Sequence, residues 1–227
     1  DYVAQAINQV KNNPDNLIKV MTALEIDGMA LQYASNELKN NKEVVLAAVE
    51  EDGLALQYAF VNLKNDKEVV MKAVLKDSLA LQYASVNLKN DRKVVMAAVE
   101  QHGLALQYAD NELKKDKEFV MAAVQDNWRT LQYASPELQK DKEVVLPAVA
   151  ENGFALQYVS GDMMKSDDYK EVVLAAVKKN GSALQYVFGD LQNDKEVVQV
   201  SISGGNLKIA DDKLKKDKEF VLAAVKL

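Results

Sequence analysis

One glutamine recurs along the chain at a spacing that could serve recognition. The tripeptide Leu-Gln-Tyr occurs seven times, with the first six copies 25 residues apart and a last step of 28. Its glutamines are Gln32, Gln57, Gln82, Gln107, Gln132, Gln157 and Gln185. Such a series could read a linear polymer with one contact per repeat, as some helical repeat proteins do. The alternative is structural, with stacked amides that hydrogen-bond between repeats or to the loops that join them.

Other residues that could do chemistry are better explained by structure. His102 is the single histidine, and it stands at a turn position that the other repeats fill with Asp or Asn; without cysteine it cannot build a His/Cys zinc site. The carboxylates of Glu50, Glu51 and Asp52 could pair for acid–base work, but no apolar pocket is predicted beside them to shift their pKa values. Phosphate-binding, zinc-protease, nucleophile-elbow and EF-hand motifs are absent from the sequence. We therefore predict that the chain is not an enzyme and has no catalytic, cofactor-binding or metal-binding residue.

Composition narrows the class of partner. The net charge is −6 at pH 7, which argues against nucleic acid because proteins that bind phosphate backbones usually present a basic surface. No run approaches 18 apolar residues, so we expect a soluble chain without a membrane span. The chain starts at Asp1 with no signal-peptide pattern, and we expect an excerpt or a processed form that is cytoplasmic or delivered as a secreted effector.

The 25-residue period predicts the elements that carry these residues. A period of this length is typical of a solenoid, whose units bury their apolar faces only against neighbours. In residues 66–90, Asp66 suits a helix N-cap, and Val69, Val70, Ala73 and Val74 form the apolar stripe of a short helix A. Helices A are predicted at 42–51, 67–76, 92–101, 117–126 and 142–151. Pro147 falls inside the last of these, where a regular helix would lose about 3 kcal/mol.

A second helix, B, is predicted to carry the Leu-Gln-Tyr. Leu56, Ala59 and Leu63 share one face, and Leu54 and Tyr58 share another, which indicates contacts to two neighbours. Helices B are predicted at 54–63, 79–88, 104–113, 129–138 and 154–163.

The turn between the two helices begins with a residue that tolerates positive φ. These residues are Asp52, Asp77, His102, Asn127 and Asn152. We expect them to form left-handed C-caps of helix A. The next residue is usually Gly, which fits an N-cap of helix B.

The predicted fold is all-α, an α-solenoid of tandem 25-residue helix-turn-helix repeats with about eight units and degenerate ends. Residues 1–227 form a single array that opens with a capping helix in 1–15. The repeats are 16–40, 41–65, 66–90, 91–115, 116–140, 141–168 and 169–193, followed by a degenerate repeat at 194–216 and a partial one at 217–227.

The repeated unit resembles a catalogued family of short tandem repeats, domain-of-unknown-function family 4116. The segment Asp66-Lys67-Glu68-Val69-Val70 and the repeated Ala-Leu-Gln-Tyr-Ala carry the resemblance, which covers about residues 16–227. It implies tandem helical repeats with no assigned activity. No catalytic residue can therefore be carried over from the family.

Positions that differ between repeats are the best candidates for binding a partner. Phe60, Val61 and Phe188 are apolar where several other repeats have polar or small residues, and Trp128-Arg129 replaces a Gly-Leu pair. The predicted partner-binding residues are Phe60, Val61, Gln82, Gln107, Trp128, Arg129 and Phe188. From these residues we predict that the chain is a non-enzymatic scaffold that binds a protein or peptide of unknown identity. Two alternatives stay open: a repeat segment of a larger secreted bacterial effector or multidomain protein with catalysis elsewhere, and polymer binding (nucleic acid or glycan) through the glutamines.

Overall fold

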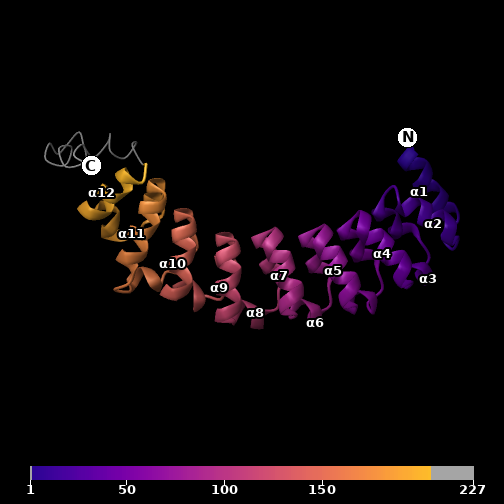
Figure 1. Cartoon of the computed structure of the whole chain (residues 1–227), viewed down its shortest axis with the longest axis horizontal. Coiled ribbons are helices and arrows are strands. Elements are labelled where there is room, and N and C mark those ends of the chain that lie inside the picture. Colours follow the sequence, from indigo (N-terminus) through magenta and orange to yellow (C-terminus); the bar gives the residue numbers. More distant parts are fainter. Residues whose placement is uncertain (1, 206–227) are drawn as a thin grey trace. The chain divides into compact units, whose positions relative to one another are not determined.

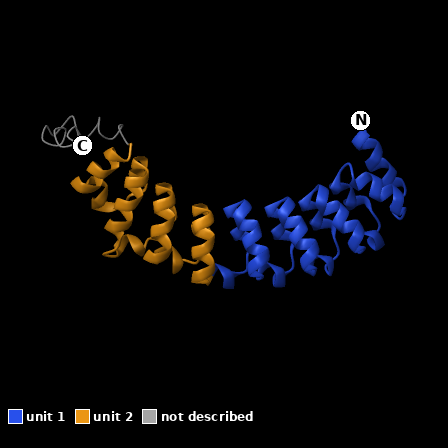
Figure 2. Ribbon diagram, viewed as in Figure 1, with its two compact units in different colours: residues 1–114 blue, residues 115–227 orange. Residues whose placement is uncertain are grey.

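The computed structural model of the chain describes residues 2–205. Every element assigned in that range is helical, and no strand occurs in it. The chain divides into two compact units, residues 1–114 and 115–227 (Figure 2). The fold is an all-α solenoid of tandem 25-residue repeats, as the sequence predicts. The predicted C-terminal partial repeat at 217–227 and residues 206–216 of the degenerate repeat lie outside the described residues.

Each repeat contains one long α-helix followed by a six-residue 3-10 helix and, in most repeats, a shorter helical turn (Figure 1). Unit 1 contains α1 (Tyr2–Asn12), α2 (Leu17–Leu24), η1 (Gly28–Tyr33), α3 (Asn36–Lys39), α4 (Lys42–Glu51), η2 (Gly53–Tyr58), η3 (Leu63–Asn65), α5 (Lys67–Lys76), η4 (Ser78–Tyr83), α6 (Val86–Lys89), α7 (Arg92–Gln101) and η5 (Gly103–Tyr108). The helix α8 (Asn111–Lys115) ends at the boundary. Unit 2 contains α9 (Lys117–Asp126), η6 (Trp128–Tyr133), η7 (Leu138–Lys140), α10 (Lys142–Glu151), η8 (Gly153–Tyr158), η9 (Met163–Lys165), α11 (Tyr169–Lys179), η10 (Gly181–Tyr186), η11 (Gly189–Asn193) and α12 (Lys195–Ser203).

The five predicted helices A are confirmed as α4, α5, α7, α9 and α10, with the predicted bounds. Their first turn is capped as expected: the Asp66 carboxylate accepts the backbone N–H groups of Glu68 (3.0 Å) and Val69 (3.2 Å). The predicted apolar stripe of α5 is fully buried, with Val69 and Val70 in the core. Helix α10 runs without interruption through Pro147.

The prediction of a single α-helix B is wrong. In its place stand a 3-10 helix and a separate short turn, divided by one extended residue such as Ala59 (φ −67°, ψ 153°). The physical reason is a hydrogen bond to the preceding repeat. The extended residue lets the N–H of Phe60 reach the carbonyl of Lys39 at 3.2 Å, and Ser85 bonds Lys64 in the same way at 2.9 Å. In a continuous α-helix, that N–H would bond a carbonyl of the same helix and could not bond the preceding repeat.

The predicted left-handed caps are also wrong. Asp52, Asp77, His102, Asn127 and Asn152 all have extended backbones with φ between −153° and −139°, and no residue other than glycine has a positive φ in the described range. These residues are N-caps of the 3-10 helices instead. The Asp52 side chain, for example, accepts the N–H of Leu54 at 2.9 Å, while His102 makes no side-chain cap bond. Asp and Asn recur here because their oxygens cap, not because they tolerate positive φ.

The glycine after this cap keeps space for the next repeat. Gly53 is the first residue of η2, not the N-cap that the sequence suggested. A Cβ placed on it would lie 2.4 Å from the carbonyl oxygen of Ala73 in α5. The backbones of adjacent repeats therefore approach too closely for a side chain at this point.

The core of each unit forms where a helix A packs between two 3-10 helices. Helix α5 contacts η4 of its own repeat and η2 of the repeat before, and the helices α4, α5 and α7 pack side by side (Figure 1). Leu56 and Leu81, from the Leu-Gln-Tyr segments, are fully buried in this layer. No 25-residue repeat has a core of its own, and stability comes from stacking.

An ion-pair ladder joins the repeats along the starts of their A helices. The ammonium of Lys42 lies 2.8 Å from the carboxylates of both Asp66 and Glu68 in the next repeat. The same pairing joins Lys67 to Asp91, Lys117 to Asp141 and Glu143, Lys142 to Asp168 and Glu171, and Lys170 to Asp194 and Glu196. The Asp-Lys-Glu motif therefore both caps a helix and links it to its neighbour.

Candidate interaction surface

The repeated glutamines hold their own 3-10 helix together. The side-chain amide of Gln57 donates to the carbonyl of Leu54, three residues back, at 3.1 Å. The same bond is made by Gln32, Gln82, Gln132 and Gln157. The bonds expected between repeats are not the ones these five amides make: each donates one N–H to a carbonyl of its own 3-10 helix. This use also weakens the case for a ladder that reads a polymer.

The backbone of the same glutamines anchors the following turn. Lys64 Nζ donates to the carbonyl of Gln57 at 2.7 Å, and Lys114 Nζ donates to that of Gln107 at the same distance. Burial of these ammonium groups lowers the pKa of Lys64 and of Lys114. Gln107, like Gln82, is half-buried. The side chain of Gln82 thus has a structural role within its 3-10 helix, whereas at Gln107 the bond involves the backbone carbonyl.

Trp128 lies in the core of unit 2 and not on a free surface. Its side chain is only 8% exposed, and its ring stacks on that of Tyr158 with centroids 6.0 Å apart and an interplanar angle of 25°. The position that holds glycine in most repeats faces the following repeat, so a larger side chain there is covered by that repeat. The prediction that Trp128 anchors a partner is therefore wrong.

Arg129 covers the outer side of this tryptophan. The Arg129 side chain is exposed, and its guanidinium carbon lies 4.4 Å from the centre of the Trp128 ring. This distance fits a cation–π contact. The backbone N–H of Trp128 donates to the Glu151 carboxyl. Partial desolvation raises the pKa of Glu151 in spite of that bond and of nearby Lys179 and Arg129. These contacts join successive repeats of unit 2. Of the two predicted site residues among them, Trp128 is buried and Arg129 is exposed.

The structure brings together two of the predicted residues and one that the prediction missed. Phe60 and Val61 follow the extended residue of one repeat and are 39% and 77% exposed, and Val86 occupies the position of Val61 in the next repeat and is 70% exposed. Val61 and Val86 line a shallow hollow of about 310 Å³ with neutral polar residues: Asn62, Asn65, Ser85 and Asn87. We call Phe60, Val61 and Val86 the turn patch. Val86 could have been found by comparing repeats, since its counterparts are Asn36 and Asn111.

Phe188 belongs to unit 2, whereas the turn patch belongs to unit 1. Its side chain is exposed, and its backbone N–H donates to the hydroxyl of Tyr169 at 3.2 Å. Gly189 follows with φ +71°, a left-handed conformation that favours glycine. The predicted residues are divided between the two units: Phe60, Val61, Gln82 and Gln107 belong to unit 1, and Trp128, Arg129 and Phe188 belong to unit 2.

Residues 2–205 hold no group of three or more His, Cys, Asp or Glu side chains placed to bind a metal ion. No helix in this part of the chain has the length and apolar character needed to cross a bilayer.

Comparison with known families gives one result, repeated along the chain. The model of a family described as "Domain of unknown function (DUF4116)" matches six times; the first five matches each span about two repeats, and the last is shorter. The matched ranges are 19–64, 43–89, 66–114, 91–139, 116–165 and 169–203. No curated protein and no solved structure matches the chain.

Proposed function

The chain belongs to the DUF4116 family of domains of unknown function, whose description assigns no activity, and we propose that it is a non-enzymatic scaffold that binds a protein partner through the turn patch. The observation that carries this proposal is the exposure of Val61 and Val86, on adjacent repeats, beside one neutral hollow. Catalysis is not part of the proposed role.

Stacking of the repeats does not require the turn patch to be apolar. In the same segment Ala59 and Leu63 are buried and supply the packing. The backbone bond from Phe60 to Lys39 is made equally well by Ser85 and Asp110 with their own counterparts. Covering apolar surface gains roughly 25 cal/mol per Å², so a patch of this kind gains free energy when a partner covers it.

The chemistry of the hollow indicates an extended peptide segment with an apolar side chain. Ser85 Oγ donates to Asn65 Oδ1 at 2.6 Å and so holds that amide in place. Amides and a hydroxyl can bond peptide groups of a partner while the two valines contact its side chain. All six lining residues are neutral, which favours an uncharged segment.

In the experiment, residues of the turn patch are replaced by those that other repeats carry at the same positions. The fold already accommodates these residue types there, so the variant should still fold. The triple variant Phe60→Ser, Val61→Asn, Val86→Asn carries the residues found at 35, 36 and 111. A photo-crosslinking amino acid at position 61 should trap the partner, and the triple variant should bind that purified partner at least tenfold more weakly, since anchors at interfaces often contribute over about 2 kcal/mol.

The matched control is Leu75→Lys, which removes an exposed apolar side chain from α5 outside the turn patch. Leu75→Lys should bind as the wild type does. Equal affinity of the wild type and the triple variant, measured by calorimetry, would show that the patch is not the binding site.

A further inference from the structure

Two positions in the turn patch lack an acidic residue that the other described repeats carry. The residue that follows Val61 is Asn62, and the residue that follows Val86 is Asn87. Both asparagines are exposed and line the hollow of about 310 Å³. The other described repeats have a carboxylate at this position: Glu37, Glu112, Glu137, Asp162 and Asp190. The hollow therefore lies where two negative charges of the repeat pattern are missing.

The ion-pair ladder changes sign beside the same hollow. At four of its junctions, a lysine pairs with both an Asp and a Glu of the next repeat. Lys67 pairs with Asp91, and the position of the Glu is taken by Lys93. A lysine with two carboxylates carries a net charge of −1, whereas Lys67, Asp91 and Lys93 together carry +1.

One carboxylate holds the two lysines at this junction. Asp91 Oδ2 accepts the ammonium of Lys67, and Asp91 Oδ1 accepts the backbone N–H of Lys93 at 3.0 Å. Arg92 lies between Asp91 and Lys93 in the sequence, and Lys67, Arg92 and Lys93 are all exposed. We call Lys67, Arg92 and Lys93 the basic junction.

The positive charge is a local excess in an acidic chain. The whole chain carries −6, whereas residues 85–93 carry +2, from Lys89, Arg92 and Lys93 against Asp91. The corresponding segments 35–43 and 60–68 of unit 1 are neutral. A negatively charged partner is therefore attracted here more than to the rest of the chain.

The basic junction borders the hollow of the turn patch. Asn65 lines the hollow and lies two residues before Lys67, so their Cα atoms are at most about 7 Å apart. Both residues reach the next repeat, because Asn65 Oδ1 accepts Ser85 Oγ at 2.6 Å and Lys67 pairs with Asp91. The Debye length at physiological salt is about 8 Å, so charges that flank a partner residue in the hollow can interact with the basic junction.

We propose that the turn patch binds an acidic peptide segment, whose apolar residue sits in the hollow and whose Asp or Glu, about one to three residues away, pairs with the basic junction. This inference rests on the proposed function and names the chemistry of the partner. An extended segment rises about 3.3 Å per residue, which sets the spacing. A peptide fits better than an anionic membrane, which is typically recognised by clusters of about four to eight Lys and Arg.

The first experiment selects peptides from a random phage-displayed library against the full chain. The wild type should enrich peptides in which an apolar residue has Asp or Glu nearby. The Lys93→Glu variant should enrich the apolar residue without the acidic preference. If the wild type enriches no peptide, the proposed function itself is wrong. If it enriches apolar peptides with no acidic preference, the proposed function stands and the present inference is wrong.

The second experiment measures the affinity of a fluorescein-labelled acidic peptide from that selection by fluorescence anisotropy. Lys93→Glu carries the residue type that other repeats have at this position, so the variant should fold. It should bind the peptide at least about fivefold more weakly, because an attraction is lost and a repulsion is gained. The wild-type affinity should fall as NaCl is raised, and that of Lys93→Glu should fall less.

A neutral peptide separates pairing of charges from damage to the hollow. The same peptide with Asn and Gln in place of Asp and Glu should bind the wild type and Lys93→Glu with equal affinity. A weaker affinity of Lys93→Glu for both peptides would contradict a pairing with the acidic residues. Equal affinity of the two chains for the acidic peptide would contradict it as well.

Lys76→Glu is the matched control, because it makes the same change of charge at the other end of helix α5. Lys76 is exposed, and Glu51 holds the same position in α4. This variant should bind the acidic peptide as the wild type does. A loss equal to that of Lys93→Glu would mean that the net charge of the chain, and not the basic junction, governs binding.

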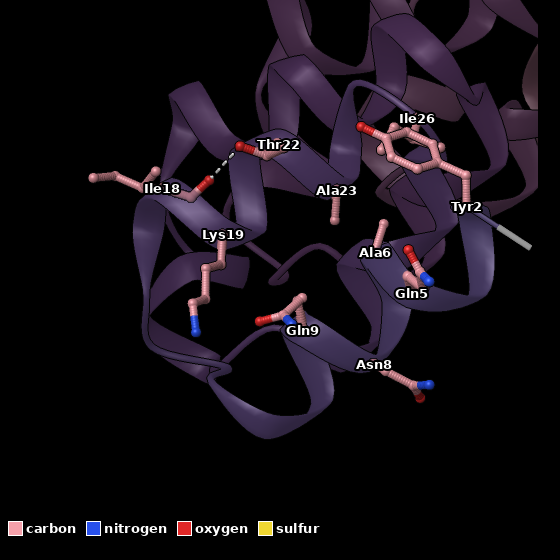
Figure 3. A pocket seen from close by; sticks show the side chains of 10 residues that line it. All are labelled: Tyr2, Gln5, Ala6, Asn8, Gln9, Ile18, Lys19, Thr22, Ala23 and Ile26. Carbon is pink, nitrogen blue, oxygen red and sulfur yellow. Dashed lines mark hydrogen bonds between the residues drawn. The ribbon is translucent and has the colours of Figure 1, made fainter.

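A second control concerns the larger hollow of unit 1, of about 610 Å³, which lies between α1 and α2 (Figure 3). Lys19 is the only charged residue among those that line it. Lys19→Glu places an acid in the first turn of α2, where it suits the helix dipole. The variant should bind the acidic peptide normally. A loss of affinity in Lys19→Glu without one in Lys93→Glu would place the peptide in that hollow and contradict the proposal.

Vesicles of equal parts phosphatidylserine and phosphatidylcholine test the membrane as an alternative source of negative charge. The full chain should not sediment with them. Sedimentation with the vesicles that Lys93→Glu abolishes would show that the basic junction meets lipid, and would contradict a peptide partner.

Discussion

At several positions in this chain, the residue type is determined more by the adjacent repeat that the residue faces than by the helix to which it belongs. A Cβ on Gly28 or Gly153 would lie 2.2 Å from a carbonyl oxygen of the next helix A, and one on Gly53 would lie at 2.4 Å. Ser78 and Trp128 occupy the same position in other repeats, so the spacing there has adjusted to a side chain. A side chain introduced at Gly53 meets backbone that has made no such adjustment.

We therefore expect Gly53→Ala to lower the free energy of unfolding by about 1–3 kcal/mol, the usual cost of overpacking. Gly161→Ala is the control, because nothing lies within 4 Å of the Cβ it would add. Urea titrations followed by circular dichroism would measure both. Equal stability of the two variants would show that the neighbouring repeat yields without cost.

Sequence reasoning at the residue scale failed where a role depends on the adjacent repeat. Trp128 was expected at the surface because its siblings are glycine, yet those glycines lie against the following repeat, which buries the ring. The structural interpretation of the glutamines placed their bonds between repeats or to the joining loops, but the bond of Gln57 goes to a carbonyl three residues back and depends on a 3-10 backbone.

At the scale of elements, a helix could be predicted where the residues that determine it lie close together in the sequence. Helix A was predicted with its bounds because an Asp or Asn cap and a Val-Val-x-x-Ala-Val stripe both lie within ten residues. The second half of the repeat was mispredicted because Leu56, Ala59 and Leu63 fit an α-helical stripe. What breaks that helix is the N–H of Phe60, which bonds a carbonyl 21 residues earlier in the chain.

Pro147 should make helix α10 less stable than its siblings, because proline has no backbone N–H to bond the preceding turn. It is the sixth residue of an unbroken helix, where the siblings in α4, α7 and α9 have Ala47, Ala97 and Ala122. We expect Pro147→Ala to raise the free energy of unfolding by up to about 3 kcal/mol, since it restores a backbone hydrogen bond and removes a steric clash. Thermal and urea unfolding would measure the gain.

The reverse exchange, Ala122→Pro in α9, should cost a similar amount. A Pro147→Ala variant no more stable than the wild type would mean that the surrounding repeats already offset the proline.

At the scale of the whole molecule, the ladder ties stability to pH. Burial alone would raise the pKa of Asp66, but the bond from Lys42 and the N–H groups of Val69 and Glu68 outweigh it and hold this pKa below its usual value. At Asp91, too, hydrogen bonds outweigh the effect of burial and lower the pKa. The pKa of Asp194 is lowered chiefly by backbone N–H groups, that of Val197 first. Bonds to carboxylates raise the pKa of Lys42, Lys117, Lys142 and Lys170.

The directions of these pKa shifts predict that the stability of the fold is constant over a middle range of pH and falls toward both acid and alkaline pH. The lowered carboxyl pKa values contribute stability above the unfolded value of about 4, and this is lost as the pH falls through the folded values. The raised lysine pKa values contribute stability below about 10.5, and this is lost as the pH rises through the folded values. Melting temperatures from circular dichroism between pH 2 and 11.5 should be highest between about pH 5 and 10.

Asp66→Asn tests the acid side, since Asn41 makes the same two cap bonds at the start of the corresponding helix α4. At pH 7 it should cost less than about 1 kcal/mol, as exposed pairs do, and its melting temperature should fall less steeply in acid. A wild-type melting temperature that rises toward pH 3 would contradict the assignment.

The ladder also bears on how such a chain can evolve. Each lysine hydrogen-bonds a carboxylate 24 to 26 residues further along, close to the length of one repeat. A duplication of one repeat in the gene adds a lysine and its successor's carboxylate together, and a deletion removes both, so no charge is left without a mate at the new junction. Copy number can therefore drift while each junction stays satisfied, and the exposed turn residues of every new copy are free to diverge.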